Sequence, residues 1–452
     1  MSKPTSEDIA YTADRTSRPD MRSKPPMAPR RRRTLAASII ATVCILAPMA
    51  VAAPSQATPR VAADPAEIGK WHAIAARTVA TEYGTPAATM ALYFSLASIA
   101  MYDAVVTIEG GYQPYVPQPR AQANASPEVA AATAAHRVLS HYFPKSADNL
   151  AADYAASLSD IPDGVGKVHG TRVGEAAAAA LIAERGDNGV DTTIKLPPQS
   201  GIGAWIPTPD TYAQMAVPWL GFATPYTLDS PTQFPWPGPY EVNSPEYTTD
   251  FNEVKDYGAN EGSLRDDAQT EVALFWNAAP PVQMQVSMTT QVAERGMDIA
   301  EAARAFALLN VSIADSQIAC WREKYDRAYW RPVTAIRAAA ADGNEETEGD
   351  VNWTPLLETH PHPDYPSGHA CVMGAASGTL SHLFGADSID LDVFSAYTKT
   401  TRHFDTTEAL DAETMNARVW IGFHFRKATI DGNATGHTIS DWVSSHYFQK
   451  TD

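Results

Sequence analysis

Cysteine is scarce in this sequence, with three residues in a chain of 452. Cys44 falls in an N-terminal leader, so Cys320 and Cys371 remain, which is too few for a disulfide framework. One bridge between these two stays open, but two buried thiols are the expectation. The fold must therefore depend on an apolar core, for which 44% hydrophobic residues are sufficient.

Basic residues are also few, with 34 Lys and Arg against 52 Asp and Glu and a formal net charge of −18. A surface of this sign repels nucleic acid and other anions at long range. No nucleic-acid partner is therefore expected, and any site for an anion requires a local cluster of positive charge.

The N-terminal leader holds a large share of the positive charge. Arg30 to Arg33 precede an apolar run from Leu35 to Ala53 that ends in small residues, a pattern typical of an export signal within residues 1–57. The paired arginines favour the twin-arginine route, which carries folded proteins. We expect an exported, secreted protein with no membrane contact after signal removal, and a retained signal anchor is the alternative.

Strand-like alternation of apolar and polar residues is missing, and so is any internal repeat. The predicted class is all-α, a large helical-bundle protein with two packed four-helix bundles and a long irregular excursion. The expected parts are a leader at 1–57, an N-terminal helical half at 58–195, a region rich in Pro and aromatic residues at 196–262, and a C-terminal helical half at 263–452.

Capping residues and apolar periodicity mark the expected helices. They are predicted from Asp64 to near Gly84, across 90–106, from Ser126 to about Tyr142, from Asp266 through Trp276, from Asp298 onward, and across 370–383. Between Leu196 and about Tyr257, closely spaced prolines leave no room for a helix. Interleaved tryptophans make this segment too aromatic for a disordered linker, so it is expected to wrap the helical body or to roof a pocket.

Two cations stand near the end of the long helix that begins after Asp298. Lys324 and Arg331 are seven residues apart and are expected on one face, with Trp321 one turn earlier and Pro332 ending the helix. Stacked cations repel each other unless an anion or acidic partners sit between them. A solvated charged face is the alternative.

Two further segments carry polar groups in apolar surroundings. Ser367 and Gly368 stand at a predicted helix start, where free N–H groups favour an oxyanion and His369 can exchange protons with it. Arg418 and His424 lie in a mostly apolar run and are expected to point at something buried. Taken singly, an ordinary helix cap and a satisfied core histidine explain these segments equally well.

Taken together and in order, Lys-x6-Arg-Pro, Pro-Ser-Gly-His and Arg-x5-His resemble the three-part signature of the vanadium-dependent haloperoxidases and the type-2 phosphatidic acid phosphatases. The matched residues run from Lys324 to His424, and the surroundings widen the likeness to about 265–430. The resemblance implies a cup for one oxyanion, vanadate in the haloperoxidases. Its cofactor-binding residues would be Lys324, Arg331, Ser367, Gly368, Arg418 and His424.

The resemblance also implies individual roles. His424 would be the axial vanadium ligand in a haloperoxidase or the nucleophile in a phosphatase. His369 would be the proton-transfer group, and Lys324 would polarise the reacting oxygen. Trp321 and His362 match halide-pocket positions, and His362 favours bromide over chloride. Asp267, placed before a predicted helix, is a candidate for orienting His369.

One position departs from the pattern. The family usually has an aspartate four residues after the final histidine, where it can orient the imidazole. Here that residue is Ala428, and Asp431 is the candidate to compensate. The loss affects a nucleophile more than a ligand, which favours the haloperoxidase branch.

The sequence therefore predicts a vanadate-dependent haloperoxidase whose partners are hydrogen peroxide, halide and a small organic substrate. A secreted acid phosphatase and a catalytically weak oxyanion-binding helical protein are the alternatives. The oligomeric state is left open, with a homodimer as one option.

Overall fold

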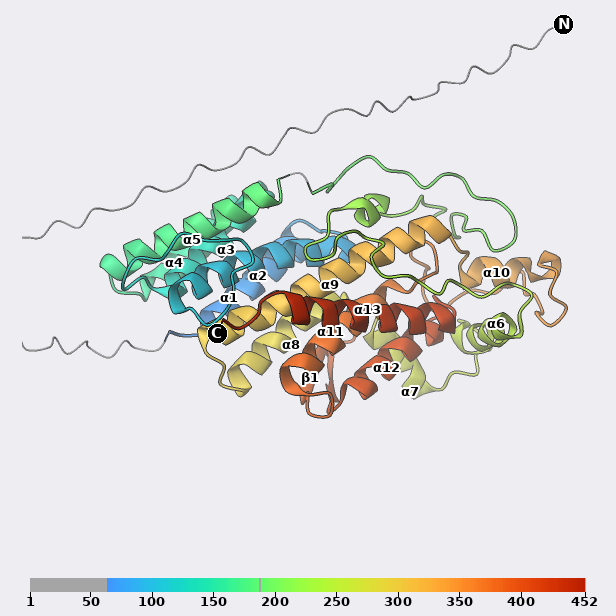
Figure 1. Cartoon of the computed structure of the whole chain (residues 1–452). Helices are drawn as coiled ribbons and strands as arrows, with labels where there is room; N and C mark the ends of the chain where they lie inside the picture. Colours follow the sequence, from blue (N-terminus) through green and yellow to red (C-terminus); the bar gives the residue numbers. More distant parts are fainter. Residues whose placement is uncertain (1–62, 187, 452) are drawn as a thin grey trace, which may run out of the picture. The chain divides into compact units, whose positions relative to one another are not determined.

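The computed structural model describes residues 63–186 and 188–451, so the predicted export signal lies outside the described residues. This part of the chain is mostly helical (Figure 1), and the all-α prediction is confirmed. The α-helices are α1 (Ala66–Ala76), α2 (Ala87–Glu109), α3 (Pro127–Tyr142), α4 (Ala147–Ser159), α5 (Val165–Glu184), α6 (Pro245–Gly258), α7 (Asp267–Phe275), α8 (Pro280–Glu294), α9 (Ile299–Arg327), α10 (Pro332–Ala338), α11 (Gly368–Phe384), α12 (Thr407–Trp420) and α13 (Arg426–His446). A π-helical turn, Arg77–Glu82, continues α1.

Helix α9 is the central element of the fold. It packs against α2 on one side and against α11 and α13 on the other (Figure 1). It therefore connects the N-terminal helices to the C-terminal helices. Asp298 caps it, as predicted, by accepting a hydrogen bond from the N–H of Glu301. Nearly all of its residues are buried, which fits a helix covered on every face.

Helix α2 confirms the predicted buried helix at 90–106. Among the described residues it alone is long and apolar enough to cross a membrane, but 83% of its apolar window is buried inside the protein. It packs against α3, α5 and α9. We therefore interpret α2 as a core helix.

The C-terminal end of α9 differs from the prediction. The helix ends at Arg327 because Ala328 adopts a left-handed conformation with φ of 43°. Arg331 is not on this helix, but precedes α10, with Pro332 at its first position. The expected single face bearing Lys324 and Arg331 is therefore wrong, although both residues still reach the same site.

Helices α11 and α13 approach closely because glycines line their contact. A Cβ atom at Gly436 would lie 2.6 Å from the carbonyl oxygen of Cys371 in the facing helix. A Cβ atom at Gly374 would clash with the backbone of Asn433. A Cβ atom at Gly432 would likewise lie 2.9 Å from the carbonyl oxygen of Ser367. The contact therefore holds the start of α11, which carries one motif, against the helix that follows another.

The expectation of two free thiols is wrong. Cys320 of α9 and Cys371 of α11 form a disulfide, with their Cα atoms 6.5 Å apart. The two cysteines are 51 residues apart, and their pairing depends on the packing of two helices, which cysteine spacing does not reveal.

Two expectations about secondary structure need correction. Strands β1 (Leu391–Ser395) and β2 (Thr400–Phe404) form an antiparallel hairpin that was not predicted. β1 does alternate buried and exposed residues, but over five residues the signal is too short to stand out. Within the proline-rich segment, α6 was also missed, although Ser244 caps it and Pro245 occupies its first position.

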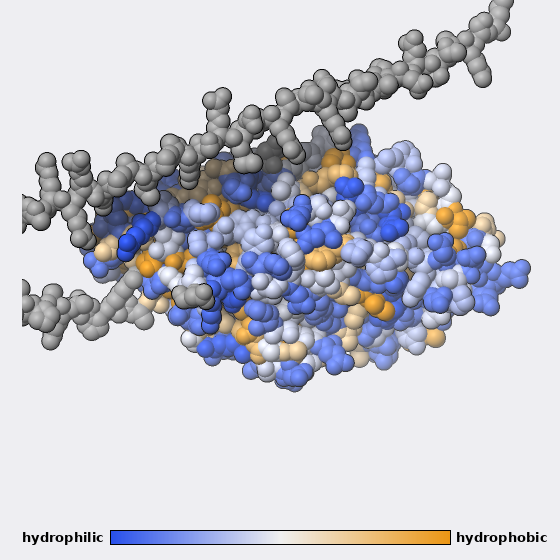
Figure 2. All heavy atoms as spheres, in the orientation of Figure 1, coloured by the Kyte–Doolittle hydropathy of each residue, from blue (hydrophilic) through white to orange (hydrophobic). Residues whose placement is uncertain are grey.

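The proline-rich segment is ordered and lies over α9. The N–H groups of Tyr226 and Thr227 donate to the carboxylate of Asp315, in the middle of α9, over 2.6 and 2.8 Å. The N–H of Ala216 donates to the carbonyl of Pro361. On the face shown in Figure 2 the described surface is mainly hydrophilic with small separate apolar spots, as the charge of the sequence leads one to expect.

Candidate active site

The three sequence motifs meet around one cavity of about 270 Å³. Lys324 comes from α9, Arg331 from the start of α10, Gly368 and His369 from the start of α11, and Arg418 and His424 from the end of α12 and the turn after it. The residues from the motifs and their surroundings that line the cavity are Gln317, Trp321, His360, His362, Gly368, His369, Arg418 and His424. Its apolar wall is formed by Pro86, Ala87, Ala88, Ala216, Val217, Pro280, Pro281, Pro361 and Val372. Val217 belongs to the proline-rich segment, which therefore forms part of this wall.

Three cations are completely buried beside this cavity. Lys324, Arg331 and Arg418 are each 0% exposed. Burial lowers the pKa of Arg331 to about 10 and that of Arg418 to about 9. Burial and the charge of Arg331 also lower the pKa of Lys324. A cluster of like charges without water is unfavourable unless an anion joins it.

The hydrogen bonds of these cations go mostly to backbone carbonyl groups. Lys324 donates to the carbonyls of Pro363 and Asp364 over 2.7 and 3.0 Å. Arg331 donates to the carbonyls of His362 and Phe423 over 2.7 and 2.6 Å. Neutral carbonyls orient the cations without cancelling their charge.

Arg418 keeps free donors at the cavity. Its Nη1 donates to the carbonyl of Trp276 over 3.1 Å. Within the described part of the chain, its Nε and Nη2 atoms are buried without a hydrogen-bond partner. Such buried unpaired donors are costly, and an oxyanion in the cavity would satisfy them.

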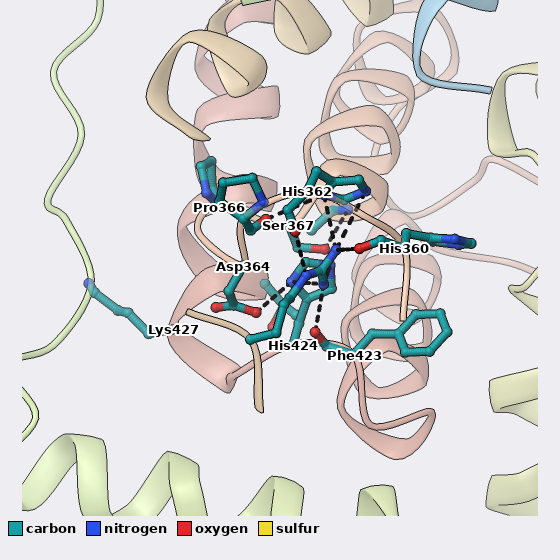
Figure 3. A network of polar contacts seen from close by, with 12 residues as sticks. His360, His362, Asp364, Pro366, Ser367, Phe423, His424 and Lys427 are labelled. Carbon is teal, nitrogen blue, oxygen red and sulfur yellow. Dashed lines mark hydrogen bonds and ion pairs between the residues drawn. The ribbon is translucent and has the colours of Figure 1, made fainter. Parts of the chain in front are cut away.

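His424 is held in one orientation between an acid and a cation (Figure 3). Its Nδ1 lies 2.8 Å from Oδ1 of Asp364, and its Nε2 lies 3.1 Å from Nη1 of Arg331. A guanidinium only donates, so Nε2 accepts and Nδ1 carries the hydrogen of the neutral ring. Burial, and then the charges of Arg331 and Lys324, lower the pKa of His424 well below its ordinary value, which keeps the ring neutral.

Asp364 is the contact that sequence reasoning missed. The residue stands directly in the run before Pro366, and an acid that close to a predicted anion site was the available signal. Asp431, the expected substitute for the missing aspartate, is engaged elsewhere. It accepts from Nζ of Lys427 over 3.0 Å and from the hydroxyl of Tyr365 over 2.6 Å.

The start of α11 is arranged as predicted. Ser367 is its N-cap, and its Oγ accepts from the N–H of Ala370. Gly368 packs against Trp321 so closely that a Cβ atom would lie 2.9 Å from the indole ring. Only glycine allows the backbone N–H groups at this helix start to stand this near the indole.

His369 lies at the cavity wall with one nitrogen free. Its ring is hydrogen-bonded to the backbone of Ala278, and in the described part of the chain its buried Nε2 has no partner. Because a carbonyl accepts, Nδ1 carries the hydrogen and Nε2 holds the lone pair. Desolvation, followed by the charge of Arg418, lowers the pKa of His369, so the ring is neutral and able to accept a proton.

Asp267 does not lie where the sequence suggested. It is exposed at the first turn of α7, whereas His369 donates its ring hydrogen to the backbone of Ala278, between α7 and α8. The helix was predicted correctly, but its acidic first turn faces away from the histidine. The assignment of Asp267 as orienter is therefore wrong.

The two candidate halide residues are neighbours. The rings of Trp321 and His362 have centroids 5.1 Å apart, and Nζ of Lys324 lies 5.6 Å from the centre of the indole ring. His362 Nδ1 accepts from Nη2 of Arg331 over 3.0 Å. His360, which sequence reasoning did not single out, also lines the cavity, and its side chain is partly open to solvent.

This donor set fits vanadate. Among the described residues no group of three His, Cys, Asp or Glu side chains could hold a metal ion by chelation. Instead, three buried cations, of which Arg418 keeps unpaired N–H donors, lie near one histidine nitrogen that carries a lone pair. An oxyanion of a metal, held by charge-assisted hydrogen bonds and a single axial nitrogen, matches that chemistry.

Comparisons with known proteins show which proteins the chain is similar to. Residues 304–452 match a family model described as the second helical-bundle domain of vanadium chloroperoxidase. The vanadium chloroperoxidase of Curvularia inaequalis is 26% identical over an aligned part that covers 28% of this chain and 28% of that enzyme's length. The aligned part thus spans less than a third of that relative.

Solved structures extend the likeness to most of the chain. A bacterial vanadium-dependent iodoperoxidase superposes with a TM-score of 0.71 at 23% identity, covering 85% of this chain and 96% of that one. A bacterial vanadium-dependent chloroperoxidase in its holo form superposes with a TM-score of 0.64 at 17% identity, covering 80% and 91%. The predicted resemblance is confirmed as a likeness: residues 304–452 match the second helical-bundle domain of vanadium chloroperoxidase, and the described chain has a fold similar to that of bacterial vanadium-dependent haloperoxidases.

Proposed function

We propose that this protein is a vanadate-dependent haloperoxidase that uses hydrogen peroxide to oxidise halide and to halogenate small organic substrates. The observation that carries the proposal is the set of unpaired Arg418 donors beside His424, whose Nε2 lone pair faces a guanidinium and no acid. The geometry is that of a site suited to a compact, highly charged oxyanion.

Each residue of the site has a distinct task. Lys324, Arg331 and Arg418 balance the charge of vanadate, and Ser367 and the N–H of Gly368 add neutral hydrogen bonds. His424 would hold the vanadate through Nε2. When bound, vanadate supplies Lewis-acid activation of peroxide. His369 accepts the proton of the incoming peroxide at Nε2.

The halide and the organic substrate fit the rest of the cavity. Trp321, His360 and His362 surround the space next to the cations, where a halide is attracted by positive charge. The presence of His362 leads us to propose bromide as the preferred halide. The apolar wall from Pro86 to Ala88 and at Pro280 suits a small organic molecule beside the reacting centre.

A phosphatase is the second candidate, because the contact between Asp364 and His424 also suits a nucleophile. A carboxylate on Nδ1 raises the electron density at Nε2, which is what attack on phosphorus requires. The same site would bind phosphate in place of vanadate.

We further propose that the protein is exported. The disulfide between Cys320 and Cys371 is consistent with an oxidising compartment. The arginines before the leader's apolar run suggest the twin-arginine route.

One experiment separates these functions. The mature protein is incubated with orthovanadate, freed of excess, and assayed for peroxide-dependent bromination of a dimedone-type acceptor; the vanadate-free protein is assayed on an aryl phosphate. Bromination that appears only after vanadate supports the haloperoxidase. Phosphate hydrolysis that vanadate inhibits supports the phosphatase. If vanadate binds and neither activity appears, the site is only a binding site.

A further inference from the structure

Asp364, which contacts His424, lies 60 residues before it in the sequence. Asp364 and His424 are 1% and 2% exposed, and their side chains meet over 2.8 Å (Figure 3). Among the described residues the second carboxylate oxygen, Oδ2, is buried without a hydrogen-bond partner. The contact with His424 is therefore the carboxylate's main polar interaction, and it holds the imidazole ring in place.

The backbone of Asp364 is itself fixed on two sides. Its N–H donates to the carbonyl of Tyr329 over 3.0 Å, and its own carbonyl accepts from Nζ of Lys324 over 3.0 Å. Pro363 and Pro366 restrict the chain around it. One residue thus connects the cation of α9 to the histidine before α13, which is a rigid support for an axial ligand.

Ala428 explains why the carboxylate is needed here. Asp364 and Ala428 line the same small internal space, together with Tyr247, Tyr329 and Phe425. A carboxylate can therefore enter this region from either of two backbone positions. The space already holds a second carboxylate, that of Asp250, which accepts from the N–H of Lys427 over 2.7 Å. A third carboxylate in this buried volume would be strongly unfavourable. An aspartate at one position thus calls for a small neutral residue at the other.

We propose that Asp364 is the positioning residue of His424 and takes the place of the carboxylate that is absent at Ala428. It accepts the Nδ1 hydrogen, so that the lone pair of Nε2 is directed to the oxyanion. The proposal deepens the proposed function and rests on it for the identity of the ligand. The tautomer it requires is a property of the vanadate-free protein.

The first test is the tautomer of His424 in the vanadate-free protein, read from ¹⁵N chemical shifts after selective histidine labelling. The unaltered protein should show hydrogen on Nδ1. In Asp364→Asn the amide group can donate to Nδ1, so the hydrogen should move to Nε2 in part or entirely. A hydrogen on Nε2 in the unaltered protein overturns the proposal, whatever the variants do.

The second test moves the carboxylate. Asp364→Ala should weaken vanadate binding about 10- to 100-fold, as loss of a hydrogen-bonded partner of a ligating histidine does. The double variant Asp364→Ala/Ala428→Asp should recover at least part of that loss, because it returns a carboxylate to the same internal space. Asp431→Asn is the matched control, since it removes a nearby buried carboxylate that contacts Lys427 and Tyr365 instead.

The outcomes separate the two proposals. Unchanged vanadate affinity in folded Asp364→Ala, or an equal loss in Asp431→Asn, overturns the positioning role. If the unaltered protein does not bind vanadate, the proposed function fails, while the tautomer measurement still decides the role of Asp364. Circular dichroism identifies any variant that fails to fold, and in that case the tautomer of His424 in the labelled unaltered protein decides whether Asp364 has this role.

Discussion

The indole ring of Trp321 occupies the space that a side chain at Gly368 would need, with its Cζ3 atom 2.9 Å from an ideal Cβ position. The contact joins α9 to the start of α11, directly beside the predicted oxyanion cup. Neither element can shift without the other. The space in the predicted oxyanion cup therefore depends on residue 368 being a glycine, without a Cβ atom.

Gly368→Ala should accordingly push the indole ring away from α11. Inserting a methyl group into a packed interior typically costs about 1–3 kcal/mol. We expect the unfolding free energy to fall by an amount in that range. The displaced indole ring should also weaken vanadate binding by at least about 1.4 kcal/mol, which corresponds to a tenfold lower affinity. Calorimetric titration with vanadate measures the second effect. Gly186→Ala is a control for an added methyl group, because the new Cβ would come no closer than 3.5 Å to its neighbours.

Arg418 should lower the stability of the vanadate-free protein, because its buried charge has no anionic partner there among the described residues. Its guanidinium is 0% exposed, and in the described part of the chain two of its nitrogens are unpaired. Arg418→Met removes a buried unpaired charge and keeps much of the volume, so the vanadate-free variant should unfold at a higher temperature, by about 1–3 kcal/mol in free energy. Vanadate should no longer raise that temperature. A variant less stable than the parent would show that Arg418 is already compensated without an anion.

The two histidines should separate binding from turnover. His424→Ala removes the nitrogen that faces the oxyanion and should abolish vanadate binding. His369→Ala removes a proton acceptor, so it should leave vanadate bound within about tenfold of the parent affinity and lower bromination about 10²- to 10⁴-fold. Equilibrium dialysis with vanadate and the dimedone assay, run on the same samples, distinguish the two. Equal losses of binding in both variants would contradict the division of roles.

The order of the motifs was sufficient to predict which residues come together at one cavity. Lys324, Arg331, Gly368, Arg418 and His424 converge as expected, because the spacing of chemical groups along the chain is a property of the sequence. The course of the backbone between these residues was less well predicted. Arg331 was placed on the helix of Lys324, but α9 ends at Arg327, and a left-handed residue at position 328 carries no reliable signal when it is alanine.

Contacts between distant segments were not predictable from one sequence. Asp364 meets His424 across sixty residues, and Cys320 meets Cys371 only because α9 and α11 pack side by side. Both pairings depend on the tertiary arrangement, whereas capping and periodicity describe local structure. For Asp267 the local structure was predicted correctly, but its proposed contact with His369 was not. A correctly predicted helix start gave no information on which way its acidic residues face.

The disulfide should contribute measurably to stability. It closes a loop with a sequence separation of 51 residues between two buried helices. By loop-closure entropy such a bridge lowers the free energy of the folded state relative to the unfolded one by about 4 kcal/mol, a model-dependent figure. The double variant Cys320→Ser/Cys371→Ser should lose most of that in urea unfolding. Detection of two free thiols in the denatured, unreduced parent protein would show that the bridge does not form.

The contact between His437 and Asp411 should make stability depend on pH. His437 Nε2 lies 2.7 Å from Oδ2 of Asp411, which also accepts from Oγ of Ser377, so the group ties α13 to α12 and α11. Burial opposes the charge of His437, but the hydrogen bond and charge of Asp411 outweigh it and raise the pKa of the histidine. A folded-state pKa above the unfolded value of 6.5 means that the pair stabilises the protein fully below that value.

That contribution is lost as pH rises through the folded-state pKa. The parent should therefore exceed His437→Gln in unfolding free energy by up to about 1 kcal/mol near pH 5.5, and the difference should disappear near pH 9. Urea unfolding of both proteins at the two pH values measures it, and taking the difference between them cancels the titration of other groups. A difference that grows with pH would mean that the neutral ring, and not the ion pair, holds these three helices together.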